Sequence, residues 1–341
     1  MKKRSTVKAV VSAVGGLALV AGAVLFGCDG NTPSIPPDDG PLDEKYYDGR
    51  KVLIDPDGFD ARSPLWSPSC DKVVFQKYEL PLYGDKWLCI YDIDEGTFTD
   101  IDNAAPSPRL YDWSPDGEWI AYQSHNNWGL YIIRPDGSEN VFVYNPGIGS
   151  TSGSFSPDGE KIVFACTEGT MVADISDPYN IEFDLLPPFQ DEDDFWYWDG
   201  FPHWSPDGRY IARMRVYEDE FDFVILTRVY VIDPEAGDEG KWELLFEESA
   251  DEWVGLDPVG WSPDGRYLSL MGSHNSDTEI WAYELDTEMY YRITCSNLYS
   301  HPSYGDWGAN GEVVFKEFDY AKYKNNPDGP WHVIYTIDGP P

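Results

Sequence analysis

Residues 113–117 of this chain read Trp-Ser-Pro-Asp-Gly, and this short stretch is repeated along the sequence. Three further copies keep an aromatic residue followed by Ser-Pro-Asp-Gly, while the first and last copies are degenerate. The aromatic residues that begin the six copies lie 42 to 57 residues apart; they are Trp66, Trp113, Phe155, Trp204, Trp261 and Trp307. A spacing this regular indicates one structural unit repeated six times.

Each copy has the composition of a tight turn between two strands. Proline fixes φ at the first central position, Asp is tolerated at the second, and Gly accepts the positive φ that closes a hairpin. Short β-branched or aromatic runs follow the turns, as at 161–164 and 312–315, and most units add a third such run, as at 130–133. A fourth run ends the unit, as at 290–294. The pattern predicts an all-β array of four-stranded units.

The repeated Trp-Ser-Pro-Asp-Gly followed by an apolar strand resembles the WD40-like (PD40) repeat of TolB-type six-bladed β-propellers. The resemblance covers residues 49–341 and implies six blades of four antiparallel strands around a central channel. The chain ends just after the third strand of the last unit, at Ile337, whereas Lys51–Ile54 precedes the first repeat without an inner strand before it. We therefore expect residues 51–54 to supply the missing outer strand of the last blade.

The first 48 residues have the composition of a targeting signal followed by a tether. Residues 1–27 have a basic start and then no charge from Ala9 to Gly27, which is typical of an export signal. The sequence Leu-Phe-Gly-Cys at 25–28 resembles a bacterial lipobox, which implies that Cys28 carries a thioether-linked diacylglycerol. The alternative is a signal anchor in which Cys28 is incidental. Residues 28–48 are acidic and rich in Pro, as expected of a flexible tether.

The overall charge excludes several classes of function. The chain has 24 Lys and Arg against 61 Asp and Glu, a formal net charge of −37. A nucleic-acid binder, or a protein held on anionic lipid by its charge, needs clustered cations, so neither is expected. Disorder throughout is also excluded, because 42% of the residues are hydrophobic and 16% aromatic.

The most distinctive insertion joins the third and fourth units. It places four acids directly before four aromatics, namely Asp191, Glu192, Asp193, Asp194, Phe195, Trp196, Tyr197 and Trp198. We expect this segment on an interblade loop over the mouth of the channel, where carboxylates and aromatic rings suit a cationic peptide, a glycan or the basic patch of an envelope protein. The composition predicts a strongly negative mouth. The alternative is an ordinary loop whose aromatics fold back on the ring.

Four histidines are candidates for a metal site at the same mouth. His125 and His274 fall in matching loops between second and third strands, and His203 and His301 fall on interblade segments just before a repeat aromatic. Similar propeller lyases acting on pectic oligosaccharides hold a metal through histidines, which would make this chain a metal-dependent polysaccharide lyase or hydrolase. Because no short spacing ties any two of these histidines together, we expect no metal and no cofactor other than the lipid on Cys28.

Other conspicuous residues have structural explanations. One aromatic at a fixed place in each unit is expected to pack between blades, and the repeated Asp to serve the turn rather than calcium. The chain has no Gly-x-Ser-x-Gly sequence for a nucleophile. Cys70, Cys89, Cys166 and Cys295 show no motif spacing and are expected to be free. The sequence thus predicts a monomeric binding scaffold, lipid-anchored on the extracytoplasmic side of a bacterial envelope, either periplasmic or at the cell surface.

Overall fold

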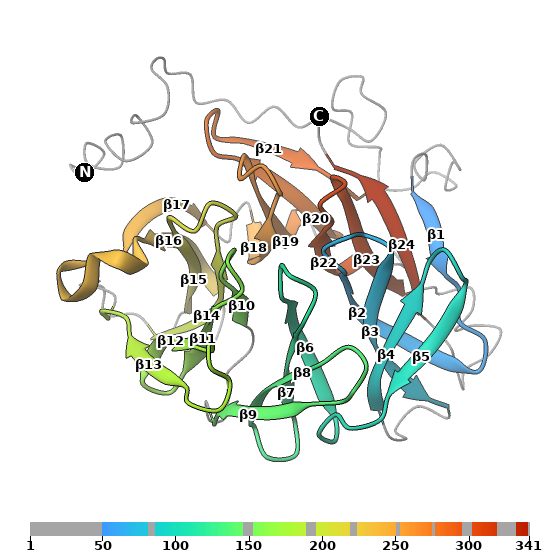
Figure 1. The fold of residues 1–341 in the computed structure, drawn as a ribbon. Helices are drawn as coiled ribbons and strands as arrows, with labels where there is room; N and C mark the ends of the chain where they lie inside the picture. The colour runs from blue at the N-terminus through green and yellow to red at the C-terminus, as the bar shows by residue number, and fades with distance from the viewer. Residues whose placement is uncertain are drawn as a thin grey trace, which may run out of the picture.

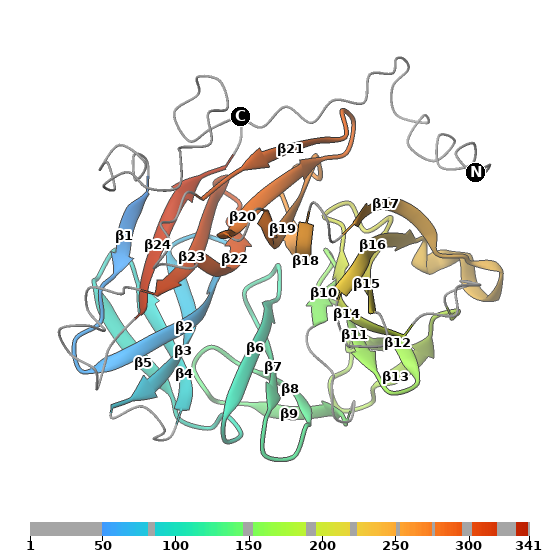
Figure 2. The ribbon, with the colours of Figure 1, turned by 180° about the vertical axis from the view of Figure 1, so that it is seen from behind.

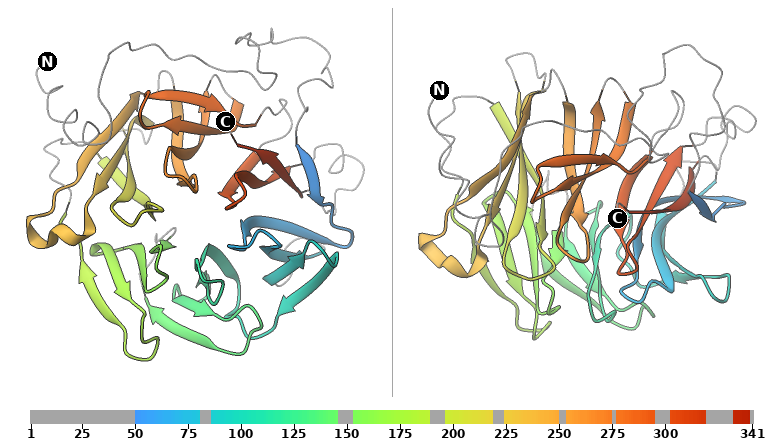
Figure 3. Two further views of the ribbon diagram at one scale, coloured as in Figure 1. Left: turned by 45° about the horizontal axis from the view of Figure 1, so that its top comes forward. Right: turned by 90° about the horizontal axis from the view of Figure 1, so that it is seen from above.

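Six four-stranded antiparallel sheets surround a common axis in the computed structural model (Figures 1 and 3). The structure describes residues 50–80, 86–145, 153–188, 196–218, 224–249, 253–274, 277–294, 302–318 and 332–339. The protein is a six-bladed β-propeller of the all-β class, as the repeats predict. No helix in these ranges is both long and apolar enough to cross a membrane.

In blades 1 to 5 the strands run in chain order from the axis outward, and in blade 6 the strands β22, β23 and β24 do so. Those of blades 1 to 3 are β2 (Phe59–Trp66), β3 (Lys72–Glu79), β4 (Lys86–Asp92) and β5 (Thr97–Ile101); β6 (Pro108–Trp113), β7 (Ile120–Ser124), β8 (Leu130–Ile133) and β9 (Asn140–Tyr144); and β10 (Gly153–Phe155), β11 (Lys161–Cys166), β12 (Gly169–Asp174) and β13 (Glu182–Leu185). Those of blades 4 to 6 are β14 (Trp196–Trp204), β15 (Ile211–Glu218), β16 (Val224–Ile232) and β17 (Glu243–Ser249), with the 3-10 helix η2 (Pro234–Glu239) before β17; β18 (Trp253–Trp261), β19 (Tyr267–His274), β20 (Asp277–Glu284) and β21 (Met289–Arg292); and β22 (Pro302–Trp307), β23 (Glu312–Phe318) and β24 (His332–Asp338).

The ring is closed by a strand from the other end of the chain. Strand β1 (Lys51–Ile54) pairs antiparallel with β24, with Lys51 opposite Thr336 and Val52 opposite Tyr335. Figure 2 shows this blue strand beside the red strands of the last blade. The N-terminal and C-terminal segments therefore share one blade, which confirms the predicted closure and covers the edge that β24 would otherwise expose.

The repeated turn is held by its own side chains. In blade 2 the hydroxyl of Ser114 donates to Asp116 Oδ1 at 2.6 Å, and its oxygen accepts the backbone N–H of Trp119 at 2.8 Å. Gly117 closes the turn with φ of +76°. Equivalent Ser to Asp bonds recur in blades 3, 4 and 5, so the prediction that this Asp serves the turn is confirmed. In the degenerate first copy, Cys70 takes the place of Gly at φ of +55°.

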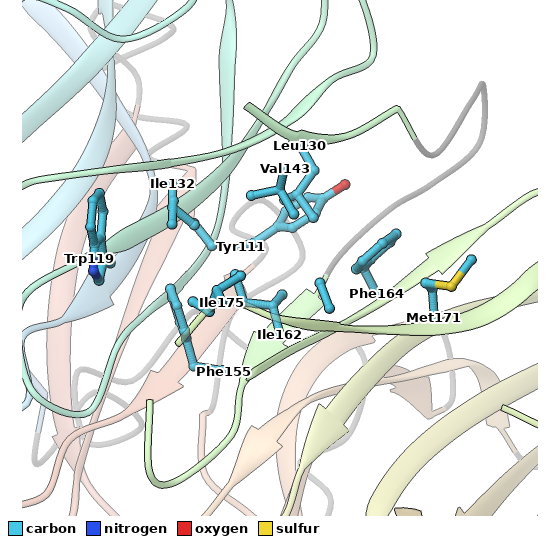
Figure 4. Packing of buried hydrophobic residues seen from close by; sticks show 12 residues of the cluster. Tyr111, Trp119, Leu130, Ile132, Val143, Phe155, Ile162, Phe164, Met171 and Ile175 are labelled. Atoms are coloured by element: carbon cyan, nitrogen blue, oxygen red, sulfur yellow. The ribbon is translucent and has the colours of Figure 1, made fainter. Parts of the chain in front are cut away.

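The core lies between neighbouring blades rather than at one centre. Figure 4 shows the cluster between blades 2 and 3, in which Tyr111, Trp119 and Ile132 face Phe155 and Ile162. All six repeat aromatics belong to such interblade clusters or pack against them, which confirms their predicted packing role. Burial of one large apolar side chain is worth roughly 1.5–3 kcal/mol, so these clusters hold the ring together.

Two smaller points separate expectation from structure. The third strand of blade 3, β12, has a weak strand signal in the sequence, because Gly and Ala are disfavoured in strands. Cys70, Cys89 and Cys166 are free thiols, and burial raises the pKa of the Cys89 thiol above its usual range. Residues 1–49, including Cys28, and Cys295 lie outside the described residues.

Candidate functional site

The two ends of the ring differ in what they carry. The six repeated turns lie at one end, which we call the turn end, because each follows the innermost strand of its blade. At the other end, the second strand of each blade leads to the third and one blade leads to the next. We call this end the mouth, since interblade connections of propellers commonly carry recognition.

The acidic and aromatic insertion divides into two parts. Asp191, Glu192, Asp193, Asp194 and Phe195 lie outside the described residues. The backbone of Trp196, Tyr197 and Trp198, in contrast, forms the first part of β14, with Trp196 opposite Glu218 and Trp198 opposite Val216. The expectation that all eight residues form an interblade loop is therefore wrong for these three. Aromatic residues favour strands, a signal that the sequence analysis gave too little weight.

The structure does not bring the candidate histidines together where it describes them. His125 follows β7 at the mouth, is exposed, and stacks edge-on against Trp128 with ring centroids 4.9 Å apart. His203 is the penultimate residue of β14 and pairs with Ala212, at the turn end of blade 4 rather than on an interblade segment. Burial lowers the pKa of His203 to about 4. The side chain of His274 and the whole of His301 lie outside the described part, and the described residues contain no group of three or more possible metal ligands.

A buried hydrogen-bonded contact links the first and last blades at the mouth. Asp60, at the start of β2, is fully buried and accepts hydrogen bonds from Nδ1 of His332 at 2.9 Å and from Nε of Arg62 at 2.7 Å. The backbone N–H of His332 also donates to Asp60, at 2.9 Å. Burial alone would raise the pKa of Asp60, but the bonds from His332 and Arg62 outweigh it and lower this pKa to about 2. Asp60 is therefore a charged carboxylate inside the ring.

Cations occupy one layer of three consecutive blades near this contact. A layer here is one level of the ring. In each blade it consists of the innermost-strand residue four positions before the repeat aromatic and of the residue opposite it on the second strand. Arg62 pairs with Gln76 in blade 1, Arg109 with Gln123 in blade 2, and Ser303 with Lys316 in blade 6. In blades 3, 4 and 5 the second-strand residues at this place are Ala165, Met214 and Met271. One half of the layer is cationic and polar, and the other half is apolar on its second strands.

A fourth cation joins the same region from the third strand of blade 1. Lys86 Nζ lies 5.4 Å from the ring centroid of Tyr78, and the guanidinium carbon of Arg62 lies 4.5 Å from the same centroid. We call Arg62, Lys86, Arg109 and Lys316 the basic cluster. Burial and the charges of Arg109 and Arg62 lower the pKa of Lys86, and burial together with Arg62 lowers the pKa of Lys316 to about 8.

The cluster could not be predicted from composition, because the net charge of the chain is strongly negative. The mouth is not acidic over its whole circumference, since blades 6, 1 and 2 present cations there. A positional signal was present in the sequence, because Arg62 and Arg109 both stand four residues before a repeat aromatic. Composition averages over the chain, whereas the fold concentrates a few cations at one place.

The fold and this mouth define a class, a six-bladed β-propeller with a charged mouth, and comparison with known proteins is consistent with it. No family model matches the chain. An uncharacterized protein of Agrobacterium fabrum, Atu1656, is 25% identical over 228 residues, which cover 62% of this chain and 68% of that protein. Dipeptidyl-peptidase 5 of Porphyromonas gingivalis is 24% identical over 204 residues, 60% of this chain but only 23% of the peptidase.

Solved structures show the same fold at low sequence identity. The propeller domain of the trilobed protease of Pyrococcus furiosus matches 83% of this chain and 82% of its own, at TM-score 0.50 and 15% identity. Oligogalacturonate lyase of Vibrio parahaemolyticus matches 85% of this chain and 93% of its own, at TM-score 0.53 and 12% identity. TolB of Acinetobacter baumannii matches 86% of this chain and 65% of its own, at TM-score 0.45 and 17% identity. The likenesses to the trilobed protease propeller and the lyase concern the fold.

Proposed function

We propose that this protein is a bacterial lipoprotein whose propeller is a binding scaffold on the extracytoplasmic side of the cell envelope. The observation that carries the binding role is the closed ring itself, in which β1 completes the blade of β24 and leaves no unpaired strand there. A closed ring of interlocked blades holds its mouth in a fixed geometry, so that a partner can bind without ordering the scaffold.

The anchoring part of the proposal rests on the N-terminal sequence. The lipobox-like residues 25–28 follow an uncharged apolar run, and the polar tether of residues 28–48 leads to the first described residue, Arg50. A diacylglycerol on Cys28 would hold the ring near a membrane without any contact between the acidic ring and lipid headgroups. No other cofactor is needed for this role.

The recognition part of the proposal concerns the acids of the insertion. Asp191, Glu192, Asp193 and Asp194 directly precede β14, whose first residue is Trp196. Their place in the chain is where blade 3 leads to blade 4, which is a mouth connection. Carboxylates at this place suit a cationic peptide, a glycan or the basic surface of an envelope protein, with the protein itself monomeric.

The decisive experiment is cross-linking in cells followed by mass spectrometry of the captured proteins. The full chain is compared with a variant in which Asp191, Glu192, Asp193 and Asp194 become Asn or Gln. Removal of charge is preferred to deletion of the segment, because a deletion that included Trp196–Trp198 would shorten β14. We expect envelope proteins that the unchanged chain captures and the variant does not.

A control uses exposed acids elsewhere on the ring. Glu182 and Asp184 are exposed on the outer strand β13, and their change to Gln and Asn removes charge without touching the insertion. Equal capture by the unchanged chain and both variants would exclude the insertion as the interface. Radiolabelled fatty acid incorporated into the unchanged chain but not into Cys28→Ala would support the anchor, and labelling of both or of neither would overturn it.

A further inference from the structure

The basic cluster stands out in a chain that has 61 acidic and 24 basic residues. Three of its members, Arg62, Arg109 and Lys316, lie in one layer of adjacent blades, and Lys86 approaches from the neighbouring strand β4. Cations that were merely scattered over a surface would not share a layer of three consecutive blades. The fold itself therefore assembles the cluster.

Specific contacts bring the members close to one another. Arg62 and Lys86 both lie over the ring of Tyr78, with 4.5 and 5.4 Å to its centroid. Gln76, which pairs with Arg62, donates from Nε2 to the carbonyl oxygen of Pro108 at 2.7 Å, and Pro108 directly precedes Arg109. The two arginines of adjacent blades are thus joined through a single buried amide.

Holding these cations together costs free energy. Burial is the largest cause that lowers the pKa of Lys86, Lys316 and the nearby His125. The charge of Arg62 adds to this effect at Lys86 and Lys316, and the charges of Lys86 and Arg109 add to it at His125. Such mutual effects mean that the like charges repel one another across a poorly solvated space. An anion placed among them would remove that cost.

Among the described residues, Asp60 is a carboxylate that contacts the cluster, and its oxygens already accept bonds from His332 and Arg62. Within the described ranges, Lys86 and Arg109 form no ion pair with a carboxylate. All four members of the cluster are partly exposed, so a ligand can reach them.

We propose that the basic cluster binds a multiply charged oxyanion, whose carboxylate or phosphate groups contact Arg62 and Arg109. Planar guanidinium groups donate paired hydrogen bonds to such oxygens, and the two lysines add charge on either side. A ligand with one charged group would contact the cations of one blade, whereas the cluster extends over three blades. This site goes beyond the scaffold proposed above and does not depend on the lipid anchor.

The acidic net charge of the chain does not prevent this binding. Charges in water are screened over about 8 Å at physiological ionic strength, so an anion at the mouth responds mainly to the nearest side chains. Because the interaction is electrostatic, the affinity should fall as salt is added. Because of the same screening, the net charge of the chain does not predict the local charge at the cluster.

Isothermal titration of the full chain tests the proposal with two probes, citrate for carboxylates and inorganic pyrophosphate for phosphates. We expect one or both to bind, and the preferred probe identifies the chemical class. Arg109→Gln and Lys86→Gln should each weaken that binding about tenfold, since a hydrogen bond to a charged group is worth about 1.4 kcal/mol or more. These two residues are chosen because neither holds the buried Asp60.

The matched control is Arg209→Gln, which removes an exposed cation at the turn end of blade 4. We expect it to bind the probe as the unchanged chain does. Failure of both probes to bind at millimolar concentration, or equal weakening by Arg209→Gln, would overturn the proposal. Arg109→Lys keeps the charge and should lose less than Arg109→Gln, which separates lost binding from lost folding. Partner capture through the insertion is measured separately, so the two proposals can fail independently.

Discussion

Asp306, in the last blade, accepts a 2.7 Å hydrogen bond at Oδ2 from the backbone N–H of Trp66, in the first. The residue that directly precedes the repeat aromatic of one blade thus accepts a hydrogen bond from the backbone of the repeat aromatic in the next blade. The same bond joins Asp112 to Phe155 at 2.7 Å and Ser154 to Trp204 at 2.8 Å. These bonds fasten neighbouring innermost strands together near the turn end, close to the axis.

Titration of Asp112 and Asp306 should make the free energy of unfolding depend on pH. Burial raises the pKa of Asp112 to about 8, with a smaller contribution from the charge of Asp306, and burial raises the pKa of Asp306 to about 7. An unfolded Asp has a pKa of 3.8, so the folded state binds more protons up to pH 8 and stability falls as pH rises. Below pH 6.5 the lowered pKa of His203 opposes this trend. We therefore expect the free energy of unfolding to fall by roughly 2 kcal/mol between about pH 6.5 and 8.

Urea unfolding at a series of pH values measures this fall. The double variant Asp112→Asn with Asp306→Asn keeps an acceptor at each place but cannot titrate, so its stability should stay nearly constant over the same window. A double variant with the same slope as the unchanged chain would show that other groups cause the dependence.

Replacement of a turn glycine should separate backbone strain from packing. Gly117 has φ of +76°, and a Cβ there would meet nothing within 4 Å. Gly117→Ala should therefore lower the free energy of unfolding by about 1 kcal/mol through strain alone. Gly117→Asn should cost less, because Asn tolerates the left-handed region. Chemical unfolding of both variants checks this, and equal losses would contradict the assignment to φ.

The buried contact between the first and last blades should behave as one unit. Asp60→Ala leaves the side chains of His332 and Arg62 without their carboxylate, and should cost about 3 kcal/mol of stability. His332→Ala should cost a similar amount, because Asp60 is fully buried. The double variant should cost clearly less than the two single losses together when all four chains are compared by urea unfolding. Additive losses would mean that the two residues act separately.

Deletion of the closing strand β1 should both destabilise the ring and cause it to self-associate. Removal of residues 50–54 takes away the buried Ile54 and the partner of the Glu317 carboxylate, Arg50, and uncovers the edge of β24. We expect a loss of about 3 kcal/mol or more and concentration-dependent association seen by light scattering. Deletion of five residues from the tether, 40–44, is the control and should change neither quantity. A ring that stays equally stable and monomeric without residues 50–54 would contradict the closure role.

Much of the fold followed from local chemistry that the sequence displays directly. Pro and Gly at fixed places specify the turn conformation, β-branched runs specify strands, and a recurrent motif every 42 to 57 residues specifies similar units. Six blades and the joining of residues 51–54 to the last blade could therefore be predicted. The weak strand β12 and the strand character of Trp196–Trp198 were missed because their residues carry competing signals. The lipobox at Cys28 is likewise a purely local pattern, and its function stays a prediction.

The site depended on the tertiary structure. Asp60 and His332 are 272 positions apart, and Asp306 and Trp66 are 240 apart. No local sequence pattern therefore predicts these two contacts. The acidic composition predicted a negative mouth, and positions within the repeats predicted four histidines at it. The ring instead places His125 and His203 at opposite ends and gathers four cations over three blades. The repeating unit could be recognised without a structure, because turns and strands depend on neighbours a few residues away. Only the closed ring decided which charges meet, because burial and Coulomb energy depend on distance in space.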